Sequence, residues 1–163
     1  MTTQSLSTND CIEDIVNQYS DMVYRLALAR TKNHADAQDV FQEVFIRYMK
    51  SREKITSDEH LKAWLIRATI NCSKNLFSSA WYKKTVALDE KLSTSMGEKS
   101  EVYYAVLNLP KKYRTVVHLF YFEDMSIAEI SEITNMNVST IKSQLSRART
   151  MLKDTLRKEY DYV

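Results

Sequence analysis

The fold is decided by the stretch Ser126-Ile-Ala-Glu-Ile-Ser-Glu-Ile-Thr-Asn-Met-Asn-Val-Ser-Thr-Ile-Lys-Ser-Gln-Leu-Ser-Arg-Ala-Arg149. Its first residue, Ser126, forms a capping box with Glu129, which predicts the start of a short helix. Residues 134–137 form a turn, in which Asn135 can adopt the positive φ that such turns need. A second helix is expected from about Ser139 past residue 152. Two helices joined by a four-residue turn predict a helix-turn-helix.

The second of these helices has the side chains expected of a helix that enters a DNA major groove. Residues 138–149 carry three basic residues and no acid, interleaved with hydroxyl and amide groups. Such groups donate hydrogen bonds to phosphates and to base edges. The candidate DNA-contacting residues are Ser139, Thr140, Lys142, Ser143, Gln144, Arg147 and Arg149. The alternative is an ordinary helical hairpin with a solvated basic face.

Glycine and proline are scarce, with one of each in 163 residues, Gly97 and Pro110. Because turns between strands draw heavily on both, their scarcity predicts an all-α protein. Glycine-rich phosphate loops and dinucleotide fingerprints are excluded, since the chain lacks the glycines they require. Pro110 suits the first position of a further helix. The predicted apolar stripe of that helix is Tyr113, Val116, Val117, Phe120 and Tyr121, and that of the last helix is Val138, Ile141, Leu145, Ala148 and Leu152.

Apolar residues recur every three or four positions in the first half of the chain as well, which predicts amphipathic helices. The first is expected to start near Asn9 or Asp10, and the second to span residues 35–51. A capping box of Thr56 and Glu59 predicts the start of a third. A polar break at residues 71–75 is expected to lead into a short fourth helix ending near residue 84.

Residues 85–100 differ in composition, with three serines, the single glycine and few apolar residues. This change predicts a flexible linker. We therefore expect two small helical domains, residues 8–84 and 101–163, joined by that linker.

The net charge is only +2, but the charges are unevenly distributed. Residues 1–60 carry seven basic and ten acidic side chains, whereas residues 61–84 carry five basic ones and no acid. Together with residues 138–149 this makes two acid-free basic segments. Two such segments on a nearly neutral chain indicate two contact surfaces for a polyanion.

The two cysteines, Cys11 and Cys72, lie far apart in the sequence and form no ligand cluster. No zinc or other cofactor is therefore expected, and free thiols favour a reducing compartment. The sequence shows no signal peptide and no apolar run long enough to cross a membrane. We expect a cytoplasmic protein without membrane insertion.

The stretch 126–149 resembles the C-terminal helix-turn-helix of extracytoplasmic-function (ECF) RNA polymerase sigma factors, above all in Thr140-Ile-Lys-Ser143 and Arg147-Ala-Arg149. The Leu109-Pro110 pair upstream also matches. The resemblance implies that this motif, residues 126–145, contacts the −35 element of a promoter. The family usually has glycine where this chain has Asn135 and Ser139.

The first half resembles the same family. The segment Asp36-Ala-Gln-Asp-Val-Phe-Gln-Glu-Val-Phe-Ile-Arg47 is similar to the part that docks on the coiled-coil clamp of core polymerase. The residues thereby implied in core binding are Asp36, Asp39, Gln42, Glu43 and Arg47. The alternative is that these polar side chains only solvate the outside of a helix, as most charged helical residues do.

Residues 61–75 resemble the helix and loop that recognise the −10 element. The residues that the resemblance implies are Asn71, Lys74 and Asn75, and the aromatic and basic side chains that follow them add Trp81, Lys83 and Lys84 as candidate contacts. Trp81 can stack on unpaired bases beside these cations, or it can pack against its own domain. Asn71 can contact a base or cap a helix. The family tends to be arginine-rich after Asn75, where this chain is not.

The resemblance implies core RNA polymerase, promoter DNA and an anti-sigma factor as partners, and no enzymatic activity. Three alternatives stay open: a helix-turn-helix regulator that does not dock on polymerase, a small helical enzyme, and a helical module that binds only proteins. His34, His60 and His118 are scattered singly along the chain and do not form a convincing constellation with an acid and a nucleophile. His118 lies in an apolar run, which favours a core or interface histidine over a catalyst.

Overall fold

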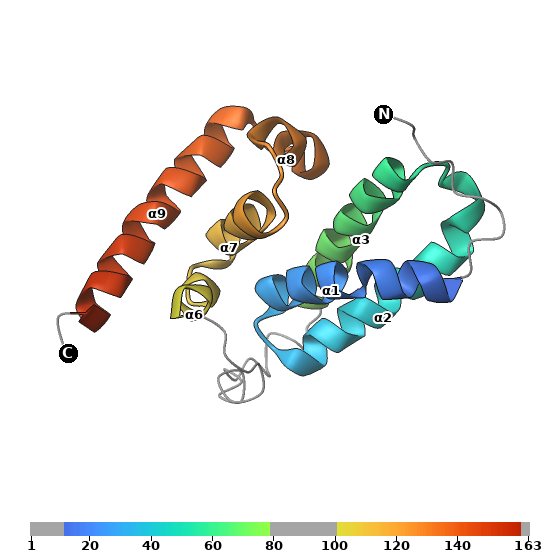
Figure 1. Ribbon diagram of the computed structural model, residues 1–163, viewed down its shortest axis with the longest axis horizontal. Helices are drawn as coiled ribbons and strands as arrows, with labels where there is room; N and C mark the ends of the chain where they lie inside the picture. The colour runs from blue at the N-terminus through green and yellow to red at the C-terminus, as the bar shows by residue number, and fades with distance from the viewer. Residues whose placement is uncertain (1–11, 79–100, 161–163) are drawn as a thin grey trace. The chain divides into compact units, whose positions relative to one another are not determined.

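The computed structural model describes residues 12–78 and 101–160 and is helical (Figure 1). No strand occurs within these two ranges, and the all-α prediction is confirmed. The chain divides into two compact units, Met1–Leu88 and Asp89–Val163. The predicted linker at residues 85–100 lies outside the described residues. None of the helices described is both long and apolar enough to span a bilayer.

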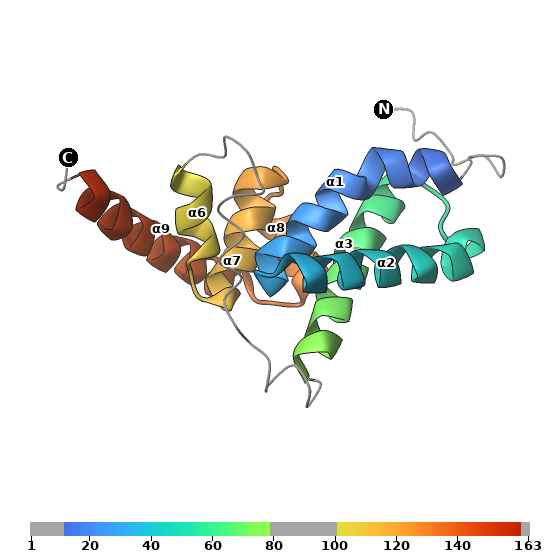
Figure 2. The ribbon, with the colours of Figure 1, turned by 90° about the horizontal axis from the view of Figure 1, so that it is seen from below.

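Three helices build unit 1: α1 (Ile12–Thr31), α2 (His34–Ser51) and α3 (Asp58–Ser78), with a short 3₁₀ turn, η1 (Arg52–Lys54), after α2. Each of the three helices packs against the other two, and α3 crosses both of its neighbours (Figures 1 and 2). The core comes from apolar stripes with the expected three- and four-residue spacing. Its fully buried members include Val23, Leu26, Leu28, Val44, Leu61, Leu65 and Ile66.

Two helix starts in unit 1 test the capping predictions. Asn33 caps α2, since its side-chain oxygen accepts a hydrogen bond from the backbone N–H of Asp36 at 3.0 Å. The predicted start of α2 was one residue too late. The predicted capping box of Thr56 was wrong, because the hydroxyl of Ser57 accepts from the N–H of His60 at 3.2 Å while Thr56 is exposed. The predicted start of the first helix lies outside the described residues.

The predicted polar break at residues 71–75 was also wrong, because α3 runs through it without interruption. The buried polar side chains there find partners inside the helix or on α1. Thr69 Oγ1 donates to the carbonyl of Leu65 at 2.7 Å. Ser73 Oγ donates to the carbonyl of Ile70 at 2.8 Å and accepts from Arg30 Nε at 3.0 Å. A helix tolerates polar residues when their hydrogen bonds are met in this way.

Unit 2 contains α6 (Glu101–Leu107), α7 (Lys111–Val117), a π-helical turn η2 (His118–Phe122), α8 (Ile127–Thr134) and α9 (Val138–Tyr160). Helix α9 packs against α6, α7 and α8. Pro110 marks the start of α7, as its N-cap and not at the predicted first helical position. Helix α6 was not predicted, although Tyr103, Val106 and Leu107 have helical spacing and are buried.

The predicted helix-turn-helix is present as α8 and α9. Ser126 caps α8, its hydroxyl accepting from the N–H of Glu129 at 3.1 Å. Asn135 ends α8 in the left-handed region with φ 58°. Both features confirm the sequence analysis. In the turn, the hydroxyl of Ser131 donates to the carbonyl of Met136 at 2.6 Å.

Two residues of the predicted apolar stripes are exposed. Tyr121 is 47% and Val138 41% exposed. Tyr121 lies in the π-helical turn, which holds more residues per turn than an α-helix and rotates it out of the 3.6-residue register. Val138 is the first residue of α9, at the open end of its buried stripe. The other predicted stripe residues include Tyr113, Val116, Ile141 and Leu145, which are buried as expected.

His118 is a buried core residue, as predicted, with 2% of its surface exposed. Its Nε2 lies 3.3 Å from a carboxylate oxygen of Glu123. Its ring stacks on Phe122 with a centroid distance of 5.4 Å. The π-helical turn is therefore anchored from within the core.

We predict that Asn135→Ala destabilises unit 2, whereas Asn135→Gly leaves its stability nearly unchanged. Placing alanine in the left-handed region costs about 1–2 kcal/mol, because its Cβ is crowded and it has no side-chain amide to form a local hydrogen bond. Glycine avoids this cost because it has no Cβ. Residues 89–163 contain no tryptophan whose fluorescence could report on unit 2. Amide hydrogen exchange in α9 measures the effect instead. Glu132→Ala, an exposed change in α8, is the control, and equal protection in the Ala and Gly variants would contradict the prediction.

Candidate nucleic-acid interface

The predicted DNA-contacting residues of α9 surround its buried stripe of Ile141, Leu145 and Ala148. All are exposed except Gln144, which is half-buried. Since successive residues of a helix are rotated by about 100°, they fall into an outward face and two flanks. Ser139 and Ser143 lie on the side of α9 opposite this stripe and are exposed.

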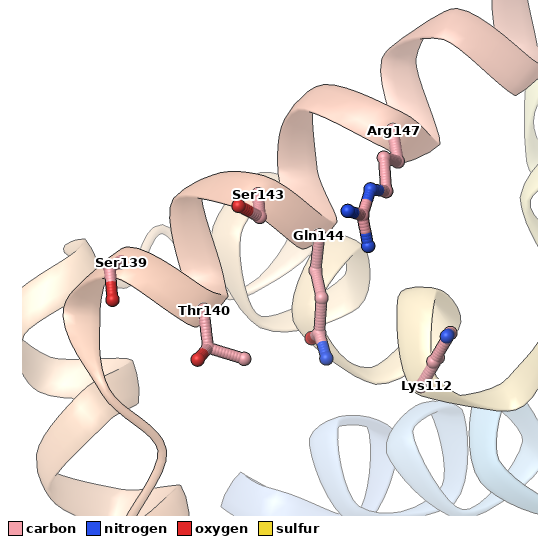
Figure 3. Close-up of a pocket in the computed structure, with 6 residues that line it drawn as sticks. All are labelled: Lys112, Ser139, Thr140, Ser143, Gln144 and Arg147. Carbon is pink, nitrogen blue, oxygen red and sulfur yellow. The ribbon is translucent and has the colours of Figure 1, made fainter.

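One flank of α9 borders a cavity of ≈ 380 Å³. Its lining consists of Lys112 from α7 and Ser139, Thr140, Ser143, Gln144 and Arg147 from α9 (Figure 3). The side chains of Lys112, Gln144 and Arg147 extend into the space between the two helices. The lining therefore offers two cations, three hydroxyls and one amide, and no carboxylate.

Gln144 is the most buried member of the α9 set. Its Oε1 atom is buried and has no hydrogen-bond partner within the described parts of the chain. A buried acceptor without a partner costs free energy, which a ligand with a matching donor would recover. The carboxamide offers both a donor and an acceptor, the pattern that pairs with the N6 and N7 atoms of adenine.

The other flank of α9 carries Lys142 and Arg149, seven residues apart. Arg149 Nε donates a hydrogen bond to the hydroxyl of Tyr121 at 2.7 Å. Its guanidinium also lies 5.9 Å from the ring of Phe120 and 5.8 Å from that of Tyr121. Arg149 thus fastens α9 to η2 while remaining exposed, and Lys142 projects freely into solvent.

In unit 1 the residues predicted to contact the −10 element lie on a helix, not on a loop. Asn71, Lys74 and Asn75 are all exposed on α3, and their spacing puts them on one side of it. Arg67, one turn earlier, extends this side and was missed, although it lies in the same acid-free segment. We call these four residues the α3 stripe. The predicted contacts Trp81, Lys83 and Lys84 lie outside the described residues.

The segment predicted to bind polymerase forms one side of α2. Asp39, Gln42 and Glu43 are exposed, whereas Asp36 and Arg47 are half-buried. Arg47 Nε pairs with Glu43 Oε1 at 2.9 Å. Partial burial, with the charge of Asp39 nearby, raises the pKa of Asp36.

Two large apolar side chains on α2 were missed by the sequence analysis. Ile46 is 47% and Met49 54% exposed, close in sequence to the Glu43–Arg47 pair. Their helical spacing from Gln42 and Glu43 would have shown that they share that side of the helix. Exposed apolar residues among charges are typical of a protein-binding surface.

Two family models match the chain. One, described as Sigma-70 region 2, matches residues 15–82, and the other, described as Sigma-70, region 4, matches residues 99–152. Unit 1 thus holds the first match and unit 2 the second.

Curated proteins match over nearly the whole chain. The RNA polymerase sigma factor SigV of Bacillus subtilis is 30% identical over 160 residues, which cover 94% of this chain and 95% of SigV. The ECF RNA polymerase sigma factor SigW of the same organism is also 30% identical, covering 91% of this chain and 90% of SigW.

Among solved structures, the sigma factor RpoE of Bartonella quintana, in complex with the anti-sigma factor NepR, superimposes with a TM-score of 0.66 and 21% identity. The superposition covers 89% of this chain and 96% of RpoE. CnrH, in complex with the cytosolic domain of CnrY, gives the same TM-score and identity, with 90% of this chain covered and 88% of CnrH. At 21% sequence identity, this structural similarity shows that the chain shares the fold of RpoE and CnrH.

Proposed function

The chain belongs to the ECF family of RNA polymerase sigma factors, and we propose that its two units divide the work of promoter recognition between them. As a sigma factor it binds core RNA polymerase and directs promoter-specific transcription initiation. Sigma factors are initiation factors and not enzymes, and we assign this chain no catalytic step. A regulator that does not dock on polymerase is not favoured, because the region 2 match covers unit 1.

Unit 2 is proposed to bind the −35 element, with α9 in the major groove. The observation that carries this proposal is the acid-free surface of α9, made of the seven residues predicted from the sequence. Arg147 and Lys142 are suited to phosphates, and Gln144 to a base edge. Arg149 donates its Nε–H to the hydroxyl of Tyr121, and its remaining N–H groups are proposed to donate to a further phosphate.

Unit 1 is proposed to capture the −10 element on the α3 stripe. Asn71 and Asn75 offer amide groups whose donors and acceptors match the edge of an unpaired base, and Lys74 supplies charge for the backbone. The proposal extends to Trp81, Lys83 and Lys84, which follow α3 in the chain. Because α3 is a continuous helix, the side chains of Asn71 and Asn75 lie one turn apart and can contact neighbouring nucleotides.

The exposed side of α2 is proposed to dock on core polymerase. Asp36, Asp39, Gln42, Glu43 and Arg47 supply its polar part. We add Ile46 and Met49, since an interface joins an apolar centre to a charged rim. In this proposal α2 contacts polymerase, and the α3 stripe and unit 2 contact the DNA.

Linking the two units in one chain raises their effective concentration at the two promoter elements, so neither unit needs a strong contact alone. We also propose an anti-sigma factor as a protein partner, because the structures of RpoE and CnrH were each solved in complex with a partner protein, which for RpoE is named as an anti-sigma factor. The proposed site of action is the cytoplasm, where bacterial polymerase meets DNA.

The function is tested by run-off transcription with core polymerase over a library of genomic promoters, with and without this protein. Discrete transcripts that depend on the protein are expected. An unchanged transcript pattern across the library would contradict promoter-specific initiation.

For the docking surface, we predict that Asp39→Ala combined with Glu43→Ala weakens binding to core polymerase about ten-fold, which corresponds to about 1.4 kcal/mol. Both residues are exposed, so the free energy of unfolding should change by only about 0.5 kcal/mol for each. Titration of labelled protein with core polymerase measures the effect. The matched control is Glu13→Ala with Asp14→Ala, which removes two exposed acids from α1. Equal affinities of the two double variants for core polymerase would show that Asp39 and Glu43 only solvate the surface of α2.

For the α3 stripe, we predict that Asn71→Ala impairs promoter opening more than duplex binding. Asn71 is exposed in the interior of α3, where it caps nothing, and alanine is the better helix former there. The variant should therefore be at least as stable as the wild type, and a defect in opening cannot come from unfolding.

Permanganate reactivity of the −10 thymines in the polymerase complex measures promoter opening, and thermal unfolding of the full chain measures stability. Glu59→Ala, an exposed change in the first turn of the same helix, serves as the control. Normal thymine reactivity with Asn71→Ala would remove Asn71 from the proposed contacts.

A further inference from the structure

The cavity beside α9 contains one residue that lies outside the helix-turn-helix. Lys112 belongs to the first turn of α7 and is exposed, yet its side chain extends toward Arg147 across the cavity (Figure 3). The other five lining residues all come from α9. Two helices distant in sequence thus bring two cations to one concave surface.

The described residues of unit 2 place no acid against the two cations of this surface. Salt bridges between residues 101 and 160 include no acid that pairs with Lys112 or Arg147. The Nζ atom of Lys112 lies 5.0 Å from the centroid of the Tyr113 ring. That contact restrains the ammonium group and leaves its charge in place. Hydroxyl donors from Thr140 and Ser143 line the same cavity.

The size of a helix indicates which part of the DNA meets this surface. An α-helix with its side chains is about 10–12 Å wide and so fills the major groove, which is about 12 Å wide. Base edges then face the outward side of α9. A side chain that reaches in from a second helix, beyond the flank of α9, meets the sugar–phosphate backbone at the edge of the groove.

We propose that this cavity seats a backbone phosphate of the −35 duplex, with Lys112 and Arg147 as its cationic ligands. The proposal rests on the placement of α9 in the major groove proposed above. A phosphodiester carries a single negative charge and accepts hydrogen bonds from ammonium, guanidinium and hydroxyl groups, which are the groups that line the cavity. Lys112 sets the register of α9 on the duplex and carries no sequence preference of its own.

The test uses the full chain bound to core polymerase and two DNA duplexes, one with the promoter and one with a scrambled −35 element. Binding is titrated over a range of salt concentrations. For Lys112→Ala we expect the slope of log affinity against log salt to fall by about one, and affinity at 0.15 M salt to fall about five-fold. Both duplexes should be affected alike, so that the ratio between them stays at the wild-type value.

Two further variants serve as controls. Lys111→Ala removes the same charge one residue earlier, outside the cavity lining, and should change slope and affinity far less. Lys112→Arg keeps the charge and should retain the wild-type salt slope. Amide hydrogen exchange in α9 checks that all three variants keep the fold of unit 2.

Ethylation of single phosphates locates the contact. With the wild type, ethylation of one phosphate beside the −35 element should block binding, and with Lys112→Ala this interference should disappear. The proposal is overturned if Lys112→Ala equals Lys111→Ala in slope and affinity, as it would if the cavity bound an acidic peptide. A changed ratio between the two duplexes would also overturn it, because Lys112 would then contact a base. A wild-type protein without preference for the promoter duplex would instead refute the −35 assignment of unit 2 itself.

Discussion

Burial of Ile141, Leu145 and Ala148 sets the rotation of α9 about its axis, and the surface chemistry of unit 2 depends on that rotation. Each of these side chains is at most 1% exposed, packed where α9 meets α6, α7 and α8. Burying a leucine or isoleucine contributes about 1.5–3 kcal/mol. A rotation by one residue, about 100°, would expose the stripe. The polar residues between these positions therefore have no alternative to facing outward.

The same constraint operates in α3, with a buried side that is partly polar. Leu61 and Leu65 supply its apolar part, and Thr69 and Ser73 are buried with their hydroxyls hydrogen-bonded. The bond from Arg30 to Ser73 ties the helix to α1 at this level. Because other residues of α3 form this buried side, the α3 stripe is exposed. A helix that is continuous here also holds these side chains at fixed spacing, as a loop would not.

Most of the features that the sequence predicted correctly depend on neighbouring residues, although the cap at Ser57 and helix α6 are local features that were missed. The cap at Ser126 and the positive φ of Asn135 are local, and both were found. The break expected at residues 71–75 was inferred from polar composition alone, which cannot show that Ser73 has a partner on α1. The exposure of Tyr121 follows from a π-helical turn, for which the periodicity gives no signal. That is why the elements could be predicted better than the surfaces between them.

Lys112 illustrates the same limit at the proposed site. In the sequence it belongs to a different helix from the cluster in residues 138–149, and only the packing of α7 on α9 brings it to the cavity. The α9 residues were predicted because their pattern is contiguous. The predicted contact residues that the structure describes lie on exposed or half-buried helical faces, and their contacts with DNA and polymerase are proposed above.

Arg147 and Arg149 show how packing gives different tasks to two residues of the same type. Two positions along a helix correspond to a rotation of about 200°, which places them on opposite flanks of α9. Arg147 faces the cavity shared with Lys112, whereas Arg149 is bound to Tyr121 and lies over the aromatic rings of η2. A guanidinium has five N–H donors, of which the bond to Tyr121 uses the one on Nε. Arg149 can therefore hold α9 against η2 and still donate to a phosphate through its remaining N–H groups.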